Sequence, residues 1–210
     1  MSVIFTLILV IAYTNAINFS DGIGGLCVIY VLSCLISIIV FSYFSNKEGN
    51  FIFIIFLILS LFIFLFSNFN IFVTKSFLGE SGSTFLGFIC SYLLIFYTLP
   101  DNRFFHPVLA LWASSIPTYD FITVFIKRLH KKKNPMTPDL SHIHFLMIKK
   151  NLSKLSTLII LGFSSLLFSC IGLITLKLMR IKYLLDLFLK TQMKKVRVDA
   201  GSPLVYNYNY

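Results

Sequence analysis

The chain has 210 residues, of which 57% are hydrophobic and only 12% are charged, and it carries 24 Phe and a formal net charge of +10. Its mean hydropathy of +0.86 excludes an ordinary soluble domain and indicates an integral membrane protein. The positive charge does not indicate nucleic acid as a partner, because most Lys and Arg lie in two blocks beside apolar segments and no nucleic-acid-binding motif accompanies them.

The apolar segments are continuous, whereas the strands of a membrane barrel would alternate with period two, so we expect helices. The predicted fold class is an all-α, polytopic membrane bundle of about six transmembrane helices. In chain order these spans are residues 3–16, 26–44, 51–66, a span that follows 77–87 and ends near 99, 107–126 and 156–176. The expected domains are a membrane-embedded part at 1–178 and a basic interfacial or disordered tail at 179–210, with a short amphipathic helix at 181–190.

The stretch 15–26, NAINFSDGIGGL, places Asn15, Asn18 and Asp21 three residues apart at a helix end, nearly on one face. A carboxylate and two amides are expensive in lipid, so they predict a functional site that faces the bundle interior or water. A polar helix cap before a glycine-rich turn is the alternative. Spacing alone does not decide between the two.

A second carboxylate, Glu80, lies between two glycines in the stretch 77–87, FLGESGSTFLG. It is predicted to lie on a flexible turn, which suits a bound cation, and an acidic residue beside a helix dipole is the alternative. Three hydroxyl residues are available to cap the following helix: Ser81, Ser83 and Thr84.

Asp120 falls in the last two turns of the expected span 107–126, and a structural role is favoured for it. The next loop, 127–154, holds eight Lys or Arg residues, which the positive-inside rule places in the cytoplasm. Even numbers of spans separate this loop from the other two polar stretches, so all three are expected on the cytoplasmic face of the membrane. His142 and His144 would point to nearly opposite sides of a helix, a poor fit to a zinc site, whereas an extended or turn backbone would aim one of them at an anionic ligand.

Three stretches, NAINFSDGIGGL, FLGESGSTFLGF and PVLALWASSIPTYDFITVFIKRLHKKKNPMTPDLSHIH, resemble in order and spacing the polyprenyl-phosphate N-acetylhexosamine-1-phosphate transferases. The resemblance covers about residues 14–146, the C-terminal part of the family fold, and is closest to the undecaprenyl-phosphate GlcNAc-1-phosphate transferase branch. It implies a multi-pass enzyme of the bacterial inner membrane, active on the cytoplasmic face in cell-envelope polysaccharide biosynthesis. The implied partners are UDP-N-acetylhexosamine, undecaprenyl phosphate and membrane lipid, and the implied cofactor is Mg2+, with Mn2+ as the alternative.

The resemblance also implies roles for individual residues. Asp21 and Asn18 match catalytic positions of the family. Asn15, His142 and His144 match substrate-binding positions, and Glu80 and Asp21 match metal-binding positions.

The sequence departs from the family pattern in four places. The amino-terminal spans with their paired aspartates are absent, Gly24 stands where a second Asp is usual, Glu80 replaces Asp, and Phe145 follows His144 where another His is common. We therefore expect little or no transfer by this chain alone, as in a truncated or split enzyme that is completed by an N-terminal chain or a homo-oligomer. The alternative is a non-catalytic membrane remnant or partner subunit.

Overall fold

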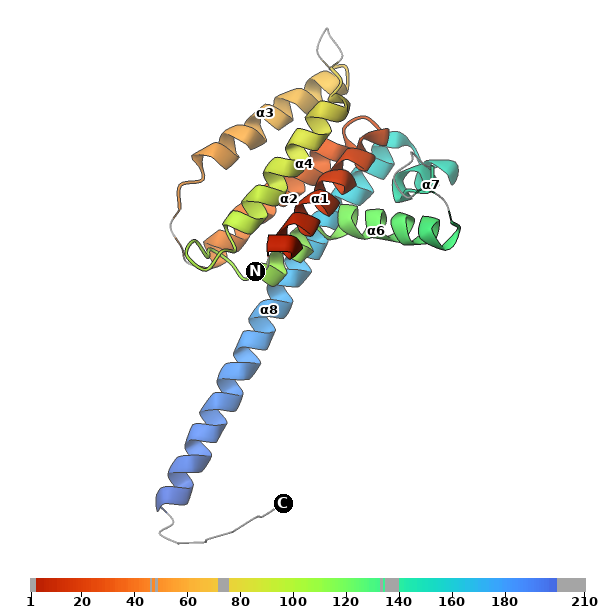
Figure 1. Ribbon diagram of the computed structural model, residues 1–210. Coiled ribbons are helices and arrows are strands. Elements are labelled where there is room, and N and C mark those ends of the chain that lie inside the picture. Colours follow the sequence, from red (N-terminus) through yellow and green to blue (C-terminus); the bar gives the residue numbers. More distant parts are fainter. Residues whose placement is uncertain are drawn as a thin grey trace. The chain divides into compact units, whose positions relative to one another are not determined.

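The computed structural model describes residues 3–45, 47, 49–71, 76–132, 134 and 140–199. Across these residues all regular structure is helical, which confirms the predicted all-α class. The elements are α1 (Val3–Phe19), η1 (Ser20–Gly22), α2 (Leu26–Phe44), α3 (Ile52–Asn68), α4 (Gly79–Phe96), α5 (Pro107–Ala113), α6 (Ser115–His130), α7 (Ile143–Lys149) and α8 (Lys154–Asp199) (Figure 1). The chain forms two compact units, Met1–Gly172 and Leu173–Tyr210, and every candidate site residue lies in the first. The predicted domain boundary after residue 178 stays a prediction.

Three helical segments of the described chain are long and apolar enough to cross a membrane: Leu26–Phe44, Gly79–Phe96 and Lys154–Met179. The bent pair α5 and α6 makes a fourth if it counts as one span. A hydrocarbon core of about 30 Å needs about 20 helical residues, whereas α1 and α3 have 17 each. The structure thus supports a membrane helix bundle with three or four candidate spans, and the predicted six would require these two shorter helices to span as well.

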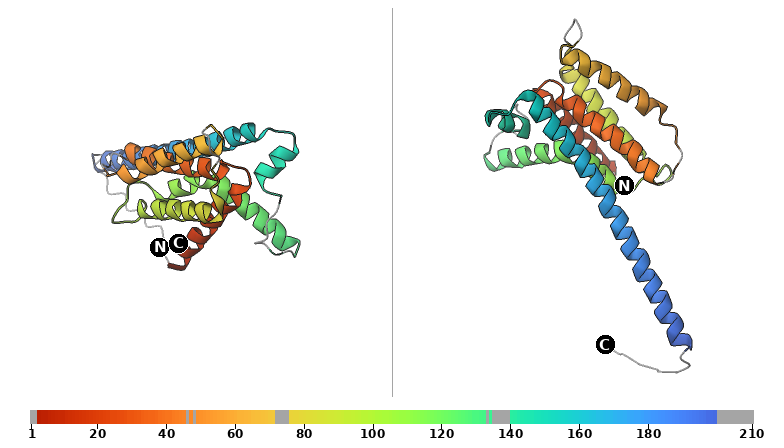
Figure 2. Two further views of the ribbon diagram at one scale, coloured as in Figure 1. Left: turned by 90° about the horizontal axis from the view of Figure 1, so that it is seen from above. Right: turned by 180° about the vertical axis from the view of Figure 1, so that it is seen from behind.

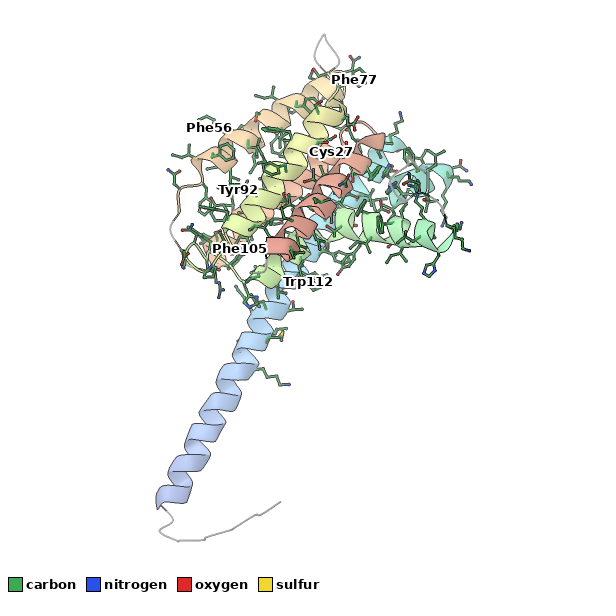
Figure 3. The ribbon with its side chains drawn as sticks, in the orientation of Figure 1. Cys27, Phe56, Phe77, Tyr92, Phe105 and Trp112 are labelled. Carbon is green, nitrogen blue, oxygen red and sulfur yellow. The ribbon has the colours of Figure 1, made fainter. Side chains whose placement is uncertain are left out.

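The most buried of these spans is α2. In its apolar window 72% of the residues are buried, against 39% in α4 and in the α8 segment. The helix α2 contacts α8 through a hydrogen bond of 2.9 Å that Ser37 Oγ donates to Ser169 Oγ. The neighbouring helices α1 and α4 also pack closely, since a Cβ on Gly87 would lie 2.9 Å from Cα of Thr14. Outward side chains such as Phe56 and Tyr92, labelled in Figure 3, are 68% and 53% exposed, as expected of a lipid-facing surface.

The segment expected to form a span over 107–126 is divided into two helices. Here α5 and α6 meet at Ser114 with a bend of 74°. Pro117 explains the break, because it has no N–H to donate to the carbonyl of Ala113 and its ring clashes with that carbonyl in a straight helix. Figures 1 and 2 show α6 extending sideways from the bundle, with α7 beside it. The bend therefore moves Asp120 to the second turn of a separate helix.

Three further expectations are corrected. Glu80 does not lie on a flexible turn, since α4 begins at Gly79, whose φ of 70° suits glycine at this helix start. Ser83 does not cap the helix, because its Oγ lies within α4, 3.1 Å from the carbonyl oxygen of Gly79 and 3.0 Å from that of Glu80. The expected short helix at 181–190 is part of the continuous helix α8, and residues 200–210 lie outside the described part.

Candidate functional site

The stretch 15–26 forms the end of α1, the tight turn η1 and the entry to α2. Asn15 Nδ2 donates to the carbonyl of Ile11 at 2.8 Å, and Ser20 Oγ donates to that of Ala16 at 2.7 Å, so both side chains bond one turn back along α1. Gly25 has φ 91°, a left-handed conformation that glycine adopts readily, and α2 begins at the next residue. This glycine reverses the chain and leaves Asp21 on the turn.

Asn18 connects this turn to the second polar stretch. Its Oδ1 accepts a hydrogen bond of 2.6 Å from Ser83 Oγ, although 65 residues separate the two. Ser83 is fully buried and lies three residues after Glu80 in the first turns of α4. The structure thus brings Asn18 against the start of α4, which carries Glu80.

An open cleft of about 710 Å³ lies between α1 and α4. Its lining combines polar and apolar side chains: Val10, Ile11, Thr14, Asn15, Glu80, Ser81, Thr84, Phe85 and Phe88. The Oγ1 of Thr14 is buried and has no hydrogen-bond partner among the described residues. Asn15 and Glu80 therefore share one cleft, whose described lining includes neither Asp21 nor the two histidines.

The histidines are positioned by a row of aromatic rings. Phe121 of α6 stacks on Phe19 of α1 at 5.9 Å between ring centroids, and Phe19 stacks on His142 at 5.5 Å. His142 in turn stacks on His144 at 5.7 Å, with only 9° between the ring planes. Of the two backbone conformations considered for this pair, the structure shows the extended one at His142, which precedes the helix with a ψ of 149°, and only His144 lies inside α7.

His144 is completely buried, and neither ring nitrogen has a hydrogen-bond partner among the described residues. Burial lowers the pKa of this imidazole to about 4, despite an opposing contribution from Asp120, so the ring is neutral near pH 7. A Cβ on Gly22 would lie 2.8 Å from its Nε2 and 2.6 Å from Cζ of Phe145. The third polar stretch therefore packs directly against the turn that carries Asp21.

Asp120 is the site residue that sequence reasoning assigned to a structural role. Its Oδ2 lies 2.9 Å from Nδ1 of His142, and its Oδ1 accepts a hydrogen bond of 2.9 Å from the backbone N–H of Ile143. One carboxylate thus holds two consecutive residues of the histidine loop. The only sequence signal was an acidic residue in an apolar segment, and the segment NPMTPD just before the loop lies largely outside the described residues.

Asp21 itself is half-buried on η1. Burial raises the pKa of its carboxyl from 3.8 to about 6, because the charged form loses hydration. A carboxyl that titrates near neutral pH is suited to accept and release a proton. Cys27, labelled in Figure 3, follows in the first turn of α2 and is fully buried, so Asp21 lies at the edge of the packed core.

Comparison with known proteins identifies the family. Residues 1–98, which include the first two polar stretches, match the model of glycosyl transferase family 4. The chain belongs to glycosyl transferase family 4. This membership confirms the resemblance drawn from the three sequence motifs.

Several relatives of this family 4 chain carry the name undecaprenyl-phosphate alpha-N-acetylglucosaminyl 1-phosphate transferase. The chain is 30% identical to the Yersinia pestis protein over 175 residues, 81% of this chain and 47% of that protein. The Escherichia coli (strain K12) protein is 30% identical over 173 residues, 80% of this chain and 47% of the relative. The Pasteurella multocida (strain Pm70) protein is 34% identical over 100 residues, 48% of this chain and 28% of the relative. The family 4 chain thus spans about half, or less, of the length of these relatives.

Proposed function

We propose that this chain acts in the transfer of GlcNAc 1-phosphate from UDP-GlcNAc to undecaprenyl phosphate, at the cytoplasmic face of a bacterial inner membrane. The observation that carries the proposal is the joining of three distant stretches: Asn18 bonds Ser83, and Gly22 contacts His144. The names of the relatives support the choice of GlcNAc 1-phosphate as the transferred group and of undecaprenyl phosphate as the acceptor.

In the proposed reaction, an oxygen of the lipid phosphate attacks the β-phosphorus of UDP-GlcNAc. A new P–O bond forms, the bond to the UMP oxygen breaks, and UMP leaves with that electron pair. Asp21 is the proposed acceptor for the proton of the attacking phosphate, since its pKa of about 6 lies near the working pH. Asn15 and the histidines would surround the nucleotide sugar.

The proposed Mg2+ is consistent with the side chains present. In the described part of the chain, no group of three or more His, Cys, Asp or Glu side chains lies close enough to hold a metal ion alone. Mg2+ usually binds through one or two carboxylates together with water and substrate phosphates, so Glu80 suits an ion that arrives with the nucleotide, and Mn2+ is the alternative. Asp21 is the second candidate ligand, and in that role it would not be the proton acceptor. When bound, the ion would offset the charge of the pyrophosphate.

We expect slow release of UMP, because Glu80 and Gly24 differ in side-chain size from the aspartates usual at these positions. Glu80 is one methylene longer than the family's Asp, and a displacement of about 1 Å can cost on the order of a hundredfold in rate. A Cβ on Gly24 would lie 3.1 Å from Oδ1 of Asn68, whose buried amide donates to the carbonyl of Ser76. Asn68 thus fills the space beside Gly24, and no second carboxylate stands on this turn, the departure on which the second candidate function, a non-catalytic subunit, rests.

The experiment that separates the two functions is UMP release by membranes that contain this protein. Supplied together, UDP-GlcNAc, Mg2+ and undecaprenyl phosphate should yield UMP at a rate that depends on the amount of protein. Leaving out the lipid phosphate should stop the release. A rate equal to that of membranes without the protein would favour the non-catalytic subunit.

The proposed topology has six spans, with the loop 127–154 in the cytoplasm because of its eight basic residues. Two single cysteines in a chain whose native cysteines are replaced by Ser test it. Leu140→Cys, at a 72% exposed position, should react with an impermeant thiol reagent only after the cells are opened. Lys47→Cys, at an exposed position between α2 and α3, should react in intact cells, and labelling of both from one side would contradict the six spans.

A further inference from the structure

The contact between Asp120 and the histidine loop uses both carboxylate oxygens. Oδ2 bonds Nδ1 of His142 and Oδ1 accepts from the N–H of Ile143, each at 2.9 Å. The side chains of His142 and Asp120 are only 6% and 15% exposed. The ring of His142 is also held on its faces by Phe19 and His144. This histidine is therefore fixed in position, orientation and hydrogen bonding at once.

The chemistry of the pair fixes the tautomer of His142. An ionised carboxylate only accepts hydrogen bonds, so Nδ1 must carry the hydrogen that joins it to Asp120. In the neutral ring, Nε2 then has a free lone pair, and no side chain among the described residues is hydrogen-bonded to it. Carboxylate groups fix the tautomer and ring orientation of histidine in this way in metal sites and catalytic triads.

We propose that Asp120 is a positioning residue, which holds His142 as the Nδ1–H tautomer and presents Nε2 as an acceptor to a hydroxyl or N–H donor of the bound nucleotide sugar. The inference rests on the proposed transferase function for its ligand. His144 cannot share this role, because it is buried and the described residues give its ring no hydrogen bond to fix a tautomer. Asp120 acts through His142 and does not touch the reacting atoms.

Asp120→Asn is the variant that isolates the effect. Its amide oxygen keeps the acceptor for the N–H of Ile143, while its NH2 group donates to Nδ1 of His142 and drives the hydrogen to Nε2. If Asp120 only caps α7, Asp120→Asn should behave like the unmodified protein. Asp120→Ala, in contrast, removes the contacts with both His142 Nδ1 and the N–H of Ile143. Asp101→Asn, an exposed carboxylate in the α4–α5 connection, is the matched control.

The first readout is the 15N NMR spectrum of labelled histidines, which is simple because the chain has four. The resonances of His142 are identified as those that disappear in the His142→Gln variant. They should show a protonated Nδ1 in the unmodified protein and a protonated Nε2 in Asp120→Asn. The Asp101→Asn spectrum should match that of the unmodified protein. The same tautomer in the unmodified protein and in Asp120→Asn would overturn the proposal.

The second readout is UMP release at varied UDP-GlcNAc. Asp120→Asn and Asp120→Ala should each raise the KM for UDP-GlcNAc about tenfold or more, because the substrate loses the acceptor at Nε2 of His142. Activity of Asp120→Asn equal to that of the unmodified protein, beside a defective Asp120→Ala, would reduce Asp120 to a helix cap. If the unmodified protein releases no UMP, the transferase function fails, while the tautomer measurement still decides whether Asp120 positions His142.

Discussion

Replacing Asp21 by Asn is expected to reduce UMP release to background while stabilising the folded chain above pH 6. The loss follows from removal of the proposed proton acceptor, since general acid and base groups typically contribute about 10²- to 10⁴-fold in rate. The gain follows from the burial of Asp21, which raises the pKa of its carboxyl from 3.8 to about 6. The measurements are UMP release and the thermal unfolding temperature of both proteins in detergent at pH 4 and pH 8.

The direction of the pH effect can be worked out from these two values. Asp21 binds its proton more tightly in the folded chain, so its contribution to stability is fully present below pH 3.8 and is lost as the pH rises through about 6. At pH 8 the carboxylate is ionised and half-buried, whereas Asn is neutral. The variant should therefore unfold at a higher temperature than the unmodified protein at pH 8, with little difference at pH 4.

The control for Asp21 is Asp101→Asn, which removes an exposed carboxylate and should change neither activity nor unfolding. An Asp21→Asn protein that keeps normal UMP release would remove Asp21 from the proposed chemistry. A lower unfolding temperature at pH 8 would show that the ionised carboxylate stabilises the turn, contrary to the effect expected from burial.

Gly22→Ala should disrupt the packing between the turn that carries Asp21 and the helix α7. The added Cβ would lie 2.6 Å from Cζ of Phe145 and 2.8 Å from Nε2 of His144, closer than atoms pack. Gly22 is not one of the residues with a positive φ, so the effect is steric and not a backbone strain. A shift of the histidine loop by about 1 Å is expected to cost on the order of a hundredfold in UMP release, and overpacking should cost about 1–3 kcal/mol of stability.

A second substitution tests whether the contact itself is the cause. Phe145→Leu removes two of the three ring atoms that crowd this Cβ, so the double variant should recover part of the activity and stability lost by Gly22→Ala. Such coupling is expected of residues in direct contact. If Gly22→Ala causes equal losses with and without the Phe145→Leu substitution, Gly22 matters for some reason other than the packing of α7.

The helices were largely predictable because the apolar runs are continuous and their ends are polar or glycine-rich. The predicted span 26–44 coincides with α2, whose start is marked by Gly25 and whose end is marked by Ser45. The bend between α5 and α6 was not predicted, although Pro117 causes it, because hydropathy along 107–126 does not change at the break. A membrane segment can contain proline and still span, so composition alone gave no sign of a 74° turn.

The site was predictable in its residues and less so in its contacts. The convergence of Asn15, Asn18 and Glu80 follows from counting spans, and the Asn18–Ser83 bond agrees with it. The contact between Asp120 and His142 depends on the bend, on an extended residue before α7 and on a row of stacked rings. None of these is visible as a local pattern, which is why Asp120 was assigned a structural role.

The fate of the β-phosphate tests the proposed function most directly. Membranes containing this protein are supplied with UDP-GlcNAc labelled with 32P in the β-phosphate, together with Mg2+ and undecaprenyl phosphate, and the lipid is extracted. Transfer of GlcNAc 1-phosphate predicts that the label enters the lipid fraction in equal amount to the UMP released, and that Asp21→Asn abolishes both. Label that stays on UDP while GlcNAc enters the lipid, or no protein-dependent labelling at all, would contradict it.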